Sequence, residues 1–327
     1  MRCNAIPKVT SPILPAVSFA NHFVTKQQLW NPIARMKTAV QLESGVSEQR
    51  SRSVTAFSAL RAHWPEYLIE GAGLGVFMIS ACFFVALLEH PASLVRQAIG
   101  SALVRRMLTG IAMGLTAISL IYSPWGKQSG AHFSPSITLT FFRLGKIEPW
   151  DAFFYIAAQF IGGTAGVLLA SRFLGSAIMN DNVRYAMTRP GSRGTAIAFV
   201  AELGISFLMM TMVLNISNSA RLARFTGVIA GALVATYISL EAPLSGMSMN
   251  PARTFASAFP AKAFDVLWIY FTAPPIGMLL ASEVYLRFRG AQRVYCAKFH
   301  HDNEKRCIFR CNYPALSNQK LTFKEVV

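Results

Sequence analysis

Charged side chains are scarce in this chain. Only 14% of the 327 residues are Asp, Glu, Lys or Arg, whereas 53% are hydrophobic. An ordinary soluble domain carries about a quarter charged residues. The composition therefore excludes an ordinary soluble globule and favours a chain that lies in a lipid bilayer.

Acidic residues are scarcer than basic ones, with 15 against 31, which gives a formal net charge of +16. In a soluble chain such an excess would indicate a nucleic-acid partner. Here most of the excess lies in residues 1–65 and 287–327. Because basic flanks stay on the cytoplasmic side of a membrane, we expect both termini to be cytoplasmic, an even number of spans and no nucleic-acid binding.

The N-terminal region has no acidic residue before Glu43 and no apolar run long enough for a signal-peptide core. We interpret residues 1–63 as a disordered basic cytoplasmic tail. Two alternatives remain open: an organelle transit peptide, or initiation at Met36, which would leave residues 1–35 out of the mature protein. The expected location is an integral position in a plasma or inner membrane.

Apolar runs of ~20 residues, long enough to cross a bilayer, occur six times: 67–88, 103–122, 150–172, 195–217, 224–243 and 265–287. Two shorter apolar stretches, 135–144 and 251–259, each begin with Pro, which suits the first position of a helix. They are too short to span. We interpret them as half-helices, which are tolerated in a membrane only where they line a cavity or are buried in protein.

The two halves of the chain repeat one pattern. Glu70 precedes the stretch "SGAHFSPSIT", and Glu202 precedes "SGMSMNPART". Each repeat, 64–175 and 190–288, holds three spans, so the second is inverted and the two half-helices meet by their N-termini near the midplane. The predicted fold is an all-α membrane protein in which an inverted repeat of six transmembrane helices carries two re-entrant half-helices.

These stretches carry a family resemblance. Matching residues are Asn250-Pro251-Ala252-Arg253 in the second half and Gly130-Ala131-His132 with Gln159 in the first. Over about residues 64–288 the chain resembles the aquaporin, or major intrinsic protein, family. The resemblance implies a homotetramer, no cofactor, one water-filled pore per subunit, and a selectivity filter that contains Arg253. The first motif departs from the family pattern because it reads Ser134-Pro135-Ser136.

Each half-helix directs about half a positive charge at the pore centre, so two facing N-termini repel cations. Ser caps a helix as well as Asn does, but it offers one rotatable hydroxyl instead of a fixed amide donor. We therefore expect Ser134 to keep the cap and to weaken the donor.

Family spacing places the remaining filter positions at Ile238 and at Met113 or Gly114, with Ser248 beside Arg253. Together they predict a filter with one fixed charge and apolar walls. Two further features, Thr254 and the pair Tyr270-Phe271, resemble water channels more than glycerol channels.

The leading functional prediction is a passive channel for water. The alternative is a wider channel for small neutral solutes such as glycerol, ammonia or metalloid acids. An ion-coupled secondary transporter is disfavoured because no carboxylate lies beside either half-helix N-terminus. An enzyme is disfavoured because no nucleophile–base pair or metal cluster falls at membrane depth.

Buried polar residues have two interpretations each. Glu70 and Glu202 are expected to accept hydrogen bonds from loop backbone that would otherwise be unpaired, although intramembrane carboxylates can also relay protons. His132, with Gln159 nearby, is expected to hold the first loop, the alternative being a titrating gate. Arg253 is expected in the filter, the alternative being an interfacial snorkel.

The segment 289–327 is predicted to be a basic cytoplasmic tail containing "CAKFHHDNEKRCIFRC". Four of its side chains match structural zinc in type and number: Cys296, His300 (or its neighbour His301), Cys307 and Cys311. The alternative is a tail that lies on anionic lipid headgroups through its basic residues, which are Lys298, Lys305, Arg306 and Arg310.

Overall fold

The computed structural model describes residues 55–316. The chain divides into two units, Met1–Ser58 and Ala59–Val327, and everything below concerns the second. Residues 1–54 of the expected N-terminal tail lie outside the described residues. The expected tail extends too far, however, because the first described helix already begins at Ala56.

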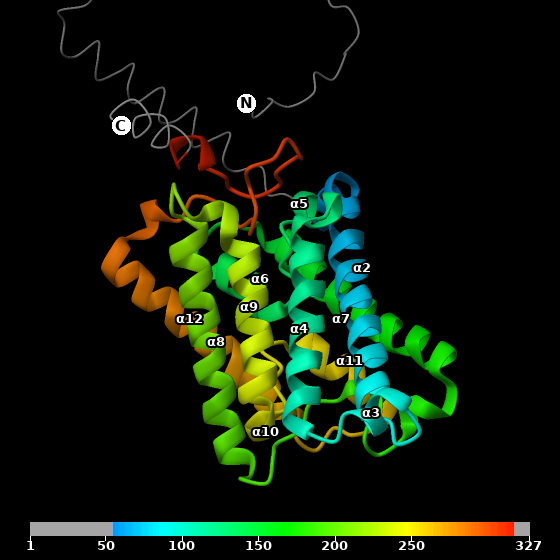
Figure 1. Cartoon of the computed structure of the whole chain (residues 1–327). Helices are drawn as coiled ribbons and strands as arrows, with labels where there is room; N and C mark the ends of the chain where they lie inside the picture. The colour runs from blue at the N-terminus through cyan, green and yellow to red at the C-terminus, as the bar shows by residue number, and fades with distance from the viewer. Residues whose placement is uncertain (1–54, 317–327) are drawn as a thin grey trace, which may run out of the picture. The chain divides into compact units, whose positions relative to one another are not determined.

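Six described helices are long and apolar enough to cross a membrane, and no strand occurs in residues 55–316 (Figure 1). The predicted all-α fold with six spans is confirmed. The spans are α2 (Ala56–Glu89), α4 (Ala102–Tyr122), α7 (Pro149–Leu174), α8 (Thr195–Ser217), α9 (Thr226–Leu240) and α12 (Leu267–Arg289). Large apolar side chains remain exposed along them, as a lipid-facing surface requires; they include Leu115, Ile161, Phe173, Val200, Leu208 and Phe288.

The two half-helices are α6 (Pro135–Arg143) and α11 (Pro251–Ala261), and each begins at the Pro of its motif. Both pack against α7 and α12, while α4 pairs with α9 and α8 with α12. The half-helices therefore lie inside a shell of long helices (Figure 1).

Short elements repeat as well. A short helix precedes each re-entrant loop, α5 (Pro124–Ser129) in the first half and α10 (Ala242–Ser245) in the second, and each ends at a left-handed glycine, Gly130 or Gly246. The remaining described elements are α3 (Leu94–Ala98), η2 (Gly175–Met179), η3 (Arg184–Ala186), η4 (Ala223–Phe225) and η5 (Ala291–Arg293).

The loops between these short helices and the half-helices share an unusual backbone. Ala131 and Phe133 have φ values of 59° and 49°, and Met247 and Met249 have 51° and 55°. Non-glycine residues rarely adopt this left-handed region. The same alternation at equivalent positions shows that the internal repeat extends to the backbone of the loops.

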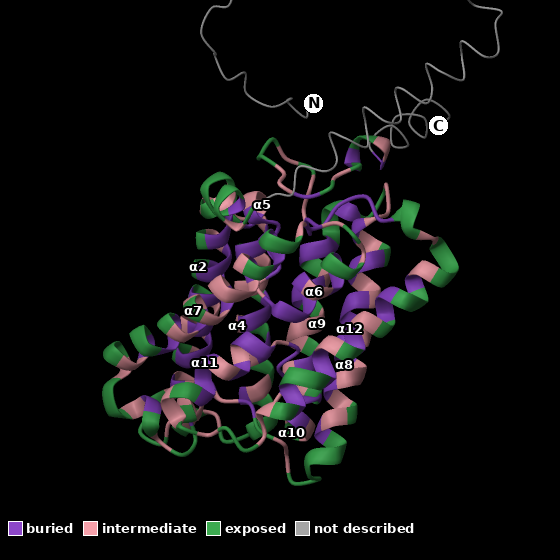
Figure 2. Ribbon diagram, turned by 180° about the vertical axis from the view of Figure 1, so that it is seen from behind, coloured by how far each residue is buried: buried purple, intermediate pink, exposed green. Residues whose placement is uncertain are grey.

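The chain after α12 is packed rather than loose. Residues 294–316 are called the tail segment, and Cys296, Lys298, Phe299 and Phe309 within it are buried. Figure 2 shows buried stretches of ribbon in the chain beyond α12. The tail segment lies at the α5 end of the helical shell, since the backbone N–H of Phe299 donates to the Gly130 carbonyl at 3.1 Å.

Candidate functional site

A buried carboxylate holds the first re-entrant loop. Glu70 on α2 accepts hydrogen bonds from the Ser129 hydroxyl at 2.7 Å and from the backbone N–H groups of His132 and Phe133 at 3.1 and 2.7 Å. An unpaired N–H group at membrane depth would cost several kcal/mol. Glu70 therefore satisfies donors that the left-handed loop backbone cannot pair within itself.

Glu202 on α8 does the same for the second loop. It accepts from the Ser245 hydroxyl at 2.8 Å and from the N–H groups of Ser248 and Met249 at 2.6 and 2.8 Å. Both carboxylates are fully buried. Their oxygens are engaged by loop donors, which leaves the two glutamates in equivalent structural positions.

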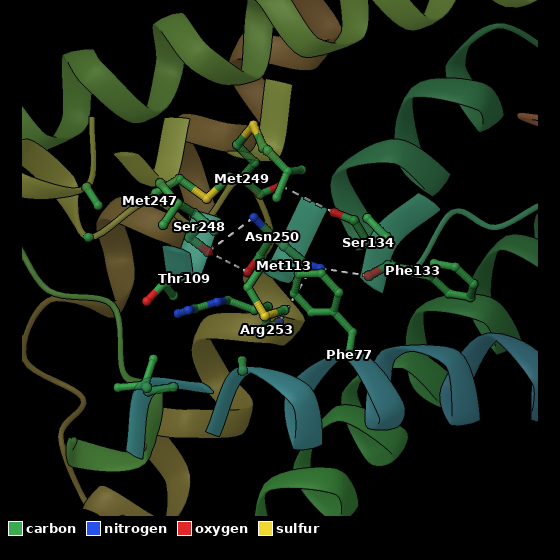
Figure 3. A pocket seen from close by; sticks show the side chains of 18 of the residues that line it. Phe77, Thr109, Met113, Phe133, Ser134, Met247, Ser248, Met249, Asn250 and Arg253 are labelled. Carbon is green, nitrogen blue, oxygen red and sulfur yellow. Dashed lines mark hydrogen bonds between the residues drawn. The ribbon is translucent and has the colours of Figure 1, made fainter. Parts of the chain in front are cut away.

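The two motif residues differ in their contacts (Figure 3). The Asn250 side-chain oxygen accepts from the N–H groups of Ala252 and Arg253 at 3.1 and 3.2 Å, and its amide nitrogen donates to the Phe133 carbonyl at 2.7 Å. Ser134 makes no capping hydrogen bond; its hydroxyl donates instead to the Met249 carbonyl at 3.4 Å. The expectation that Ser134 keeps the cap is therefore wrong, whereas its donation at 3.4 Å, against 2.7 Å from Asn250, agrees with the expected weaker donor. The short side chain reaches across to the other loop and leaves its own helix uncapped.

A cavity of about 430 Å³ runs past both half-helix N-termini. One end is lined by charged groups, among them Glu89, Arg106 and Arg184, whereas the other is lined by Ile121, Ala131, His132, Ala230 and Phe299. The half-helix motif residues Ser134 and Asn250 line the part between them, where Figure 3 shows them with Met113 and Arg253.

Most of the predicted filter positions meet on this cavity. Met113, Ile238, Ser248 and Arg253 all line it. Gly114 does not line it. A Cβ at Gly114 would lie 2.5 Å from the Gly231 carbonyl oxygen, so this residue permits the close contact of α4 with α9. Of the two positions, Met113 is the one that lines the cavity.

Arg253 carries a donor without a protein acceptor. Its Nη1 is buried and has no hydrogen-bond partner among residues 55–316. Buried charged donors are costly unless paired, and the Arg253 side chain also lines the cavity.

Several cavity residues were not identified from the sequence. Phe77 belongs to a row on α2, with Leu74, Ala81 and Val85, whose spacing of three and four residues places it on one helix face. Met247, three residues before Asn250, also lines the cavity. The helical spacing could have revealed Phe77, but nothing in the sequence marked Phe299.

His132 connects the first loop to the tail segment. Its Nε2 lies 2.9 Å from the Ala297 carbonyl oxygen, and its Nδ1 lies 3.2 Å from the Thr138 hydroxyl. Gln159 donates to Glu70 at 3.1 Å and to Thr138 at 3.2 Å. The two predicted polar residues thus join one network around the first loop.

The tail segment brings together a cluster able to hold a metal ion. Ligand atoms of Cys296, His301, Cys307 and Cys311 all lie within 4.8 Å of one another. His300 was the predicted imidazole, but it is His301 that approaches, with Nε2 3.0 Å from the Cys311 sulfur. Neighbouring residues of an irregular segment point in different directions, so spacing alone could not choose between them.

The thiols of this cluster have different acidities. The neighbouring Cys296 and Cys307 thiols and the His301 imidazole hold the pKa of Cys311 well below its usual range, whereas burial raises the pKa of Cys296 well above it. The cluster therefore stabilises negative charge on one sulfur.

Residues 60–285 match the family described as Major intrinsic protein. The chain belongs to the major intrinsic protein family. The predicted membership is confirmed, and the chain is an integral membrane protein. Its six apolar helices and paired half-helices are the structural basis of that assignment.

Individual members of the major intrinsic protein family are similar over the spanning region. The probable aquaporin NIP7-1 of Arabidopsis thaliana is 33% identical over 177 residues, which are 54% of this chain and 62% of the relative. The glycerol uptake facilitator protein-like 6 of Lactiplantibacillus plantarum is 34% identical over 176 residues, covering 53% and 81%. The matched region thus spans about three fifths of the length of the plant relative.

Among solved structures, the aquaglyceroporin from Plasmodium falciparum aligns with a TM-score of 0.59 at 16% identity, covering 71% of this chain and 98% of that one. At this identity the likeness shows the major intrinsic protein fold.

Proposed function

We propose that the protein is a passive pore for water and for small neutral polyol-like solutes. The observation that carries this proposal is the wall of the cavity at Arg253, where this charged side chain shares the lining with the apolar Met113 and Ile238. Such a wall offers hydrogen bonds to hydroxyl groups on one side and van der Waals contact to carbon atoms on the other.

Electrostatics support a neutral cargo. The N-termini of α6 and α11 both lie at the cavity, and each contributes about half a positive charge. Arg253 adds a full one. These charges oppose the passage of cations, protons included, while a neutral molecule pays no such penalty.

The features that favoured water alone lie away from the cavity. Thr254 is buried and bonded to Thr188 at 2.9 Å and to Ser248 at 2.6 Å, and the Tyr270 hydroxyl donates to the Ser245 carbonyl. Neither residue lines the cavity. Neither Met113 nor Ile238 is aromatic, and two similar proteins are named as a glycerol facilitator and an aquaglyceroporin. We therefore include polyols beside water.

The same proposal includes a homotetramer with both termini in the cytoplasm. The cytoplasmic position of the C-terminus is supported by the basic end of α12, where Arg287 and Arg289 occupy the last turn, because positive flanks remain on the cytoplasmic side.

The test is a stopped-flow measurement on liposomes that contain the purified protein. We expect faster shrinkage in a sorbitol gradient, re-swelling with glycerol, a low activation energy and no proton leak. Shrinkage equal to that of empty vesicles would overturn the proposal.

Arg253→Val is expected to raise glycerol flux severalfold and to admit protons, because it removes the fixed charge. Arg172→Val is the matched control, since Arg172 is exposed on α7 and does not line the cavity. If both variants behave like the wild type, Arg253 does not act as the filter.

A further inference from the structure

The tail segment contributes one residue to the lining of the cavity within the described part of the chain. That residue is Phe299, which is buried. Glu89, Arg106 and Arg184 are charged residues that line the cavity away from the tail segment. With Ile121, Ala131 and Ala230, the Phe299 ring gives the tail-side end of the cavity an apolar wall, and narrow apolar constrictions in pores disfavour water.

Polar contacts hold Phe299 in that position. The N–H of Phe299 donates to the Gly130 carbonyl at 3.1 Å, and the preceding Ala297 carbonyl lies 2.9 Å from His132. Between them the Lys298 side chain is buried, and its ammonium group donates to the carbonyls of Lys127 and Arg306 at 2.8 and 2.6 Å. Residues 297–299 are thus bonded to the first re-entrant loop through their backbone and to α5 through the Lys298 side chain.

Two ion pairs fix the rest of the tail segment to the spans. Arg306 donates to Glu66 of α2 at 3.1 Å, and Glu66 is fully buried. Arg310 donates to Glu148, at the start of α7, at 2.6 and 2.9 Å. These basic side chains are engaged by protein carboxylates, which argues against a tail that merely lies on lipid headgroups.

The Cys/His cluster brackets residues 297–299. Cys296 immediately precedes them, and His301 follows two residues later. Cys307 and Cys311 come from the later part of the tail segment, which folds back toward Cys296. The Cys296 and Cys307 sulfurs lie 3.6 Å apart. In a tetrahedral site with Zn–S bonds of about 2.3 Å, two sulfurs lie about 3.8 Å apart, so little movement would be needed.

We propose that the tail segment binds one zinc ion through Cys296, His301, Cys307 and Cys311, and that the bound zinc holds Phe299 in the tail-side mouth of the pore. Three thiolates and one imidazole form a closed set of four ligands, the kind found in structural zinc sites. Zinc binding displaces the thiol protons and ties residues that are 15 positions apart, so it orders a segment that has no regular hydrogen-bonded core of its own.

The metal part of the proposal is tested independently of transport. Full-length protein is purified in chelator-treated, reducing buffer, and zinc is measured by elemental analysis. We expect about one zinc per chain, and its loss in Cys307→Ser/Cys311→Ser. His300→Ala is the matched control and should retain zinc, because His300 lies outside the cluster.

Two results would overturn the metal site. One is the absence of zinc from wild-type protein that also fails to bind added Co²⁺ with the absorption bands of tetrahedral thiolate coordination. The other is a thiol titration in which Cys296 and Cys307 have formed a disulfide in protein prepared under reducing conditions.

The closure of the mouth rests on the proposed channel function and is tested in liposomes. Removal of zinc by a chelator is expected to raise water permeability severalfold in the wild type. Phe299→Ala is expected to raise it without a chelator while the zinc content stays at about one per chain. Zinc present with permeability unchanged in both experiments would overturn the closure and leave a purely structural metal site. Vesicles that stay impermeable to water in every variant would instead refute the channel function.

Discussion

The loops that lead into the two half-helices have the same backbone conformation. The half-helices differ in the side chain of the residue before the first Pro, which is Ser134 in one and Asn250 in the other. At α11, Asn250 accepts from its own helix and donates to the Phe133 carbonyl of the other loop. At α6, Ser134 makes the reciprocal donation to the Met249 carbonyl but accepts nothing from its own helix. Capping and cross-loop bonding are therefore separable functions of the motif residue, and the second is the one that the serine retains.

The half without the side-chain cap is bonded to the end of the chain. The first loop bonds to the tail segment through His132 and Gly130. In the second half, α10, which precedes the loop, is bonded to the connection between α7 and α8. The N–H of Gly191 in that connection donates to the Leu244 carbonyl at 2.9 Å. The half-helix without a side-chain cap is thus the one whose loop is bonded to the tail segment. A change in the position of the tail segment would therefore be transmitted to α6.

The largest loss of stability is expected at the two buried glutamates, which hold the two loops in the same way. Glu70→Ala and Glu202→Ala each leave two buried N–H groups and a hydroxyl without an acceptor, at a cost of roughly 1–3 kcal/mol per group. We expect each variant to lose roughly 3–9 kcal/mol of unfolding free energy, measured by SDS titration. Glu283→Ala, which breaks the exposed pair with Arg143, is the control and should change stability by less than about 1 kcal/mol. Glu70→Ala also removes an acceptor of the Gln159 amide, so a larger loss at Glu202 than at Glu70 would contradict the equivalence of the loops.

Asn250→Ser makes the second half resemble the first. The introduced serine is expected to lose the cap and to keep a cross-loop donor, which should lower the free energy of unfolding by about 1 kcal/mol. Water permeability should change little, because the helix dipole belongs to the backbone. Unchanged stability would mean that serine does cap α11, and the difference between the halves would then lie outside the motif.

Ser134→Asn makes the first half resemble the second. The longer side chain can accept from the second and third N–H groups of α6, so we expect a gain of about 0.5–1 kcal/mol in the same titration. The double variant Ser134→Asn/Asn250→Ser should return close to the wild-type value. A destabilised Ser134→Asn protein would show that the space around Ser134 does not admit the amide.

The smallest effect concerns the third motif position. Ser136 is buried with no hydrogen-bond partner for its hydroxyl within residues 55–316, whereas the equivalent position in α11 is Ala252. Ser136→Ala should therefore be neutral or stabilise by up to about 1 kcal/mol. Ala252→Ser is the reciprocal variant and should destabilise by a similar amount; a loss in both directions would indicate that each residue fits its own site.

Local patterns predicted the fold because membrane helices are defined by local properties. Apolar run length gave all six spans, and the two Pro-led motifs gave the starts of α6 and α11 at Pro135 and Pro251. The filter positions Met113 and Ile238 followed from family spacing, and both line the cavity. Contacts between distant residues were not accessible in this way.

The partner of Ser134 is 115 residues away in the sequence, and the partner of Arg306 is 240 away. No periodicity in residues 294–316 indicated that they would be buried, because the burial depends on Glu66, Glu148 and the first loop rather than on an apolar face of their own. The choice of His301 over His300 likewise depended on the path of an irregular segment.

The order in which the ribosome makes these contacts separates the two halves in time. Glu70 and Glu202 are synthesised 59 and 43 residues before the serines that they accept from, so each loop emerges with its anchor already made. The carbonyl that faces His132 is 165 residues downstream. The first half of the channel, although made first, is therefore completed last, and a chain that stops before Ala297 would carry a finished second loop beside an unfinished first one.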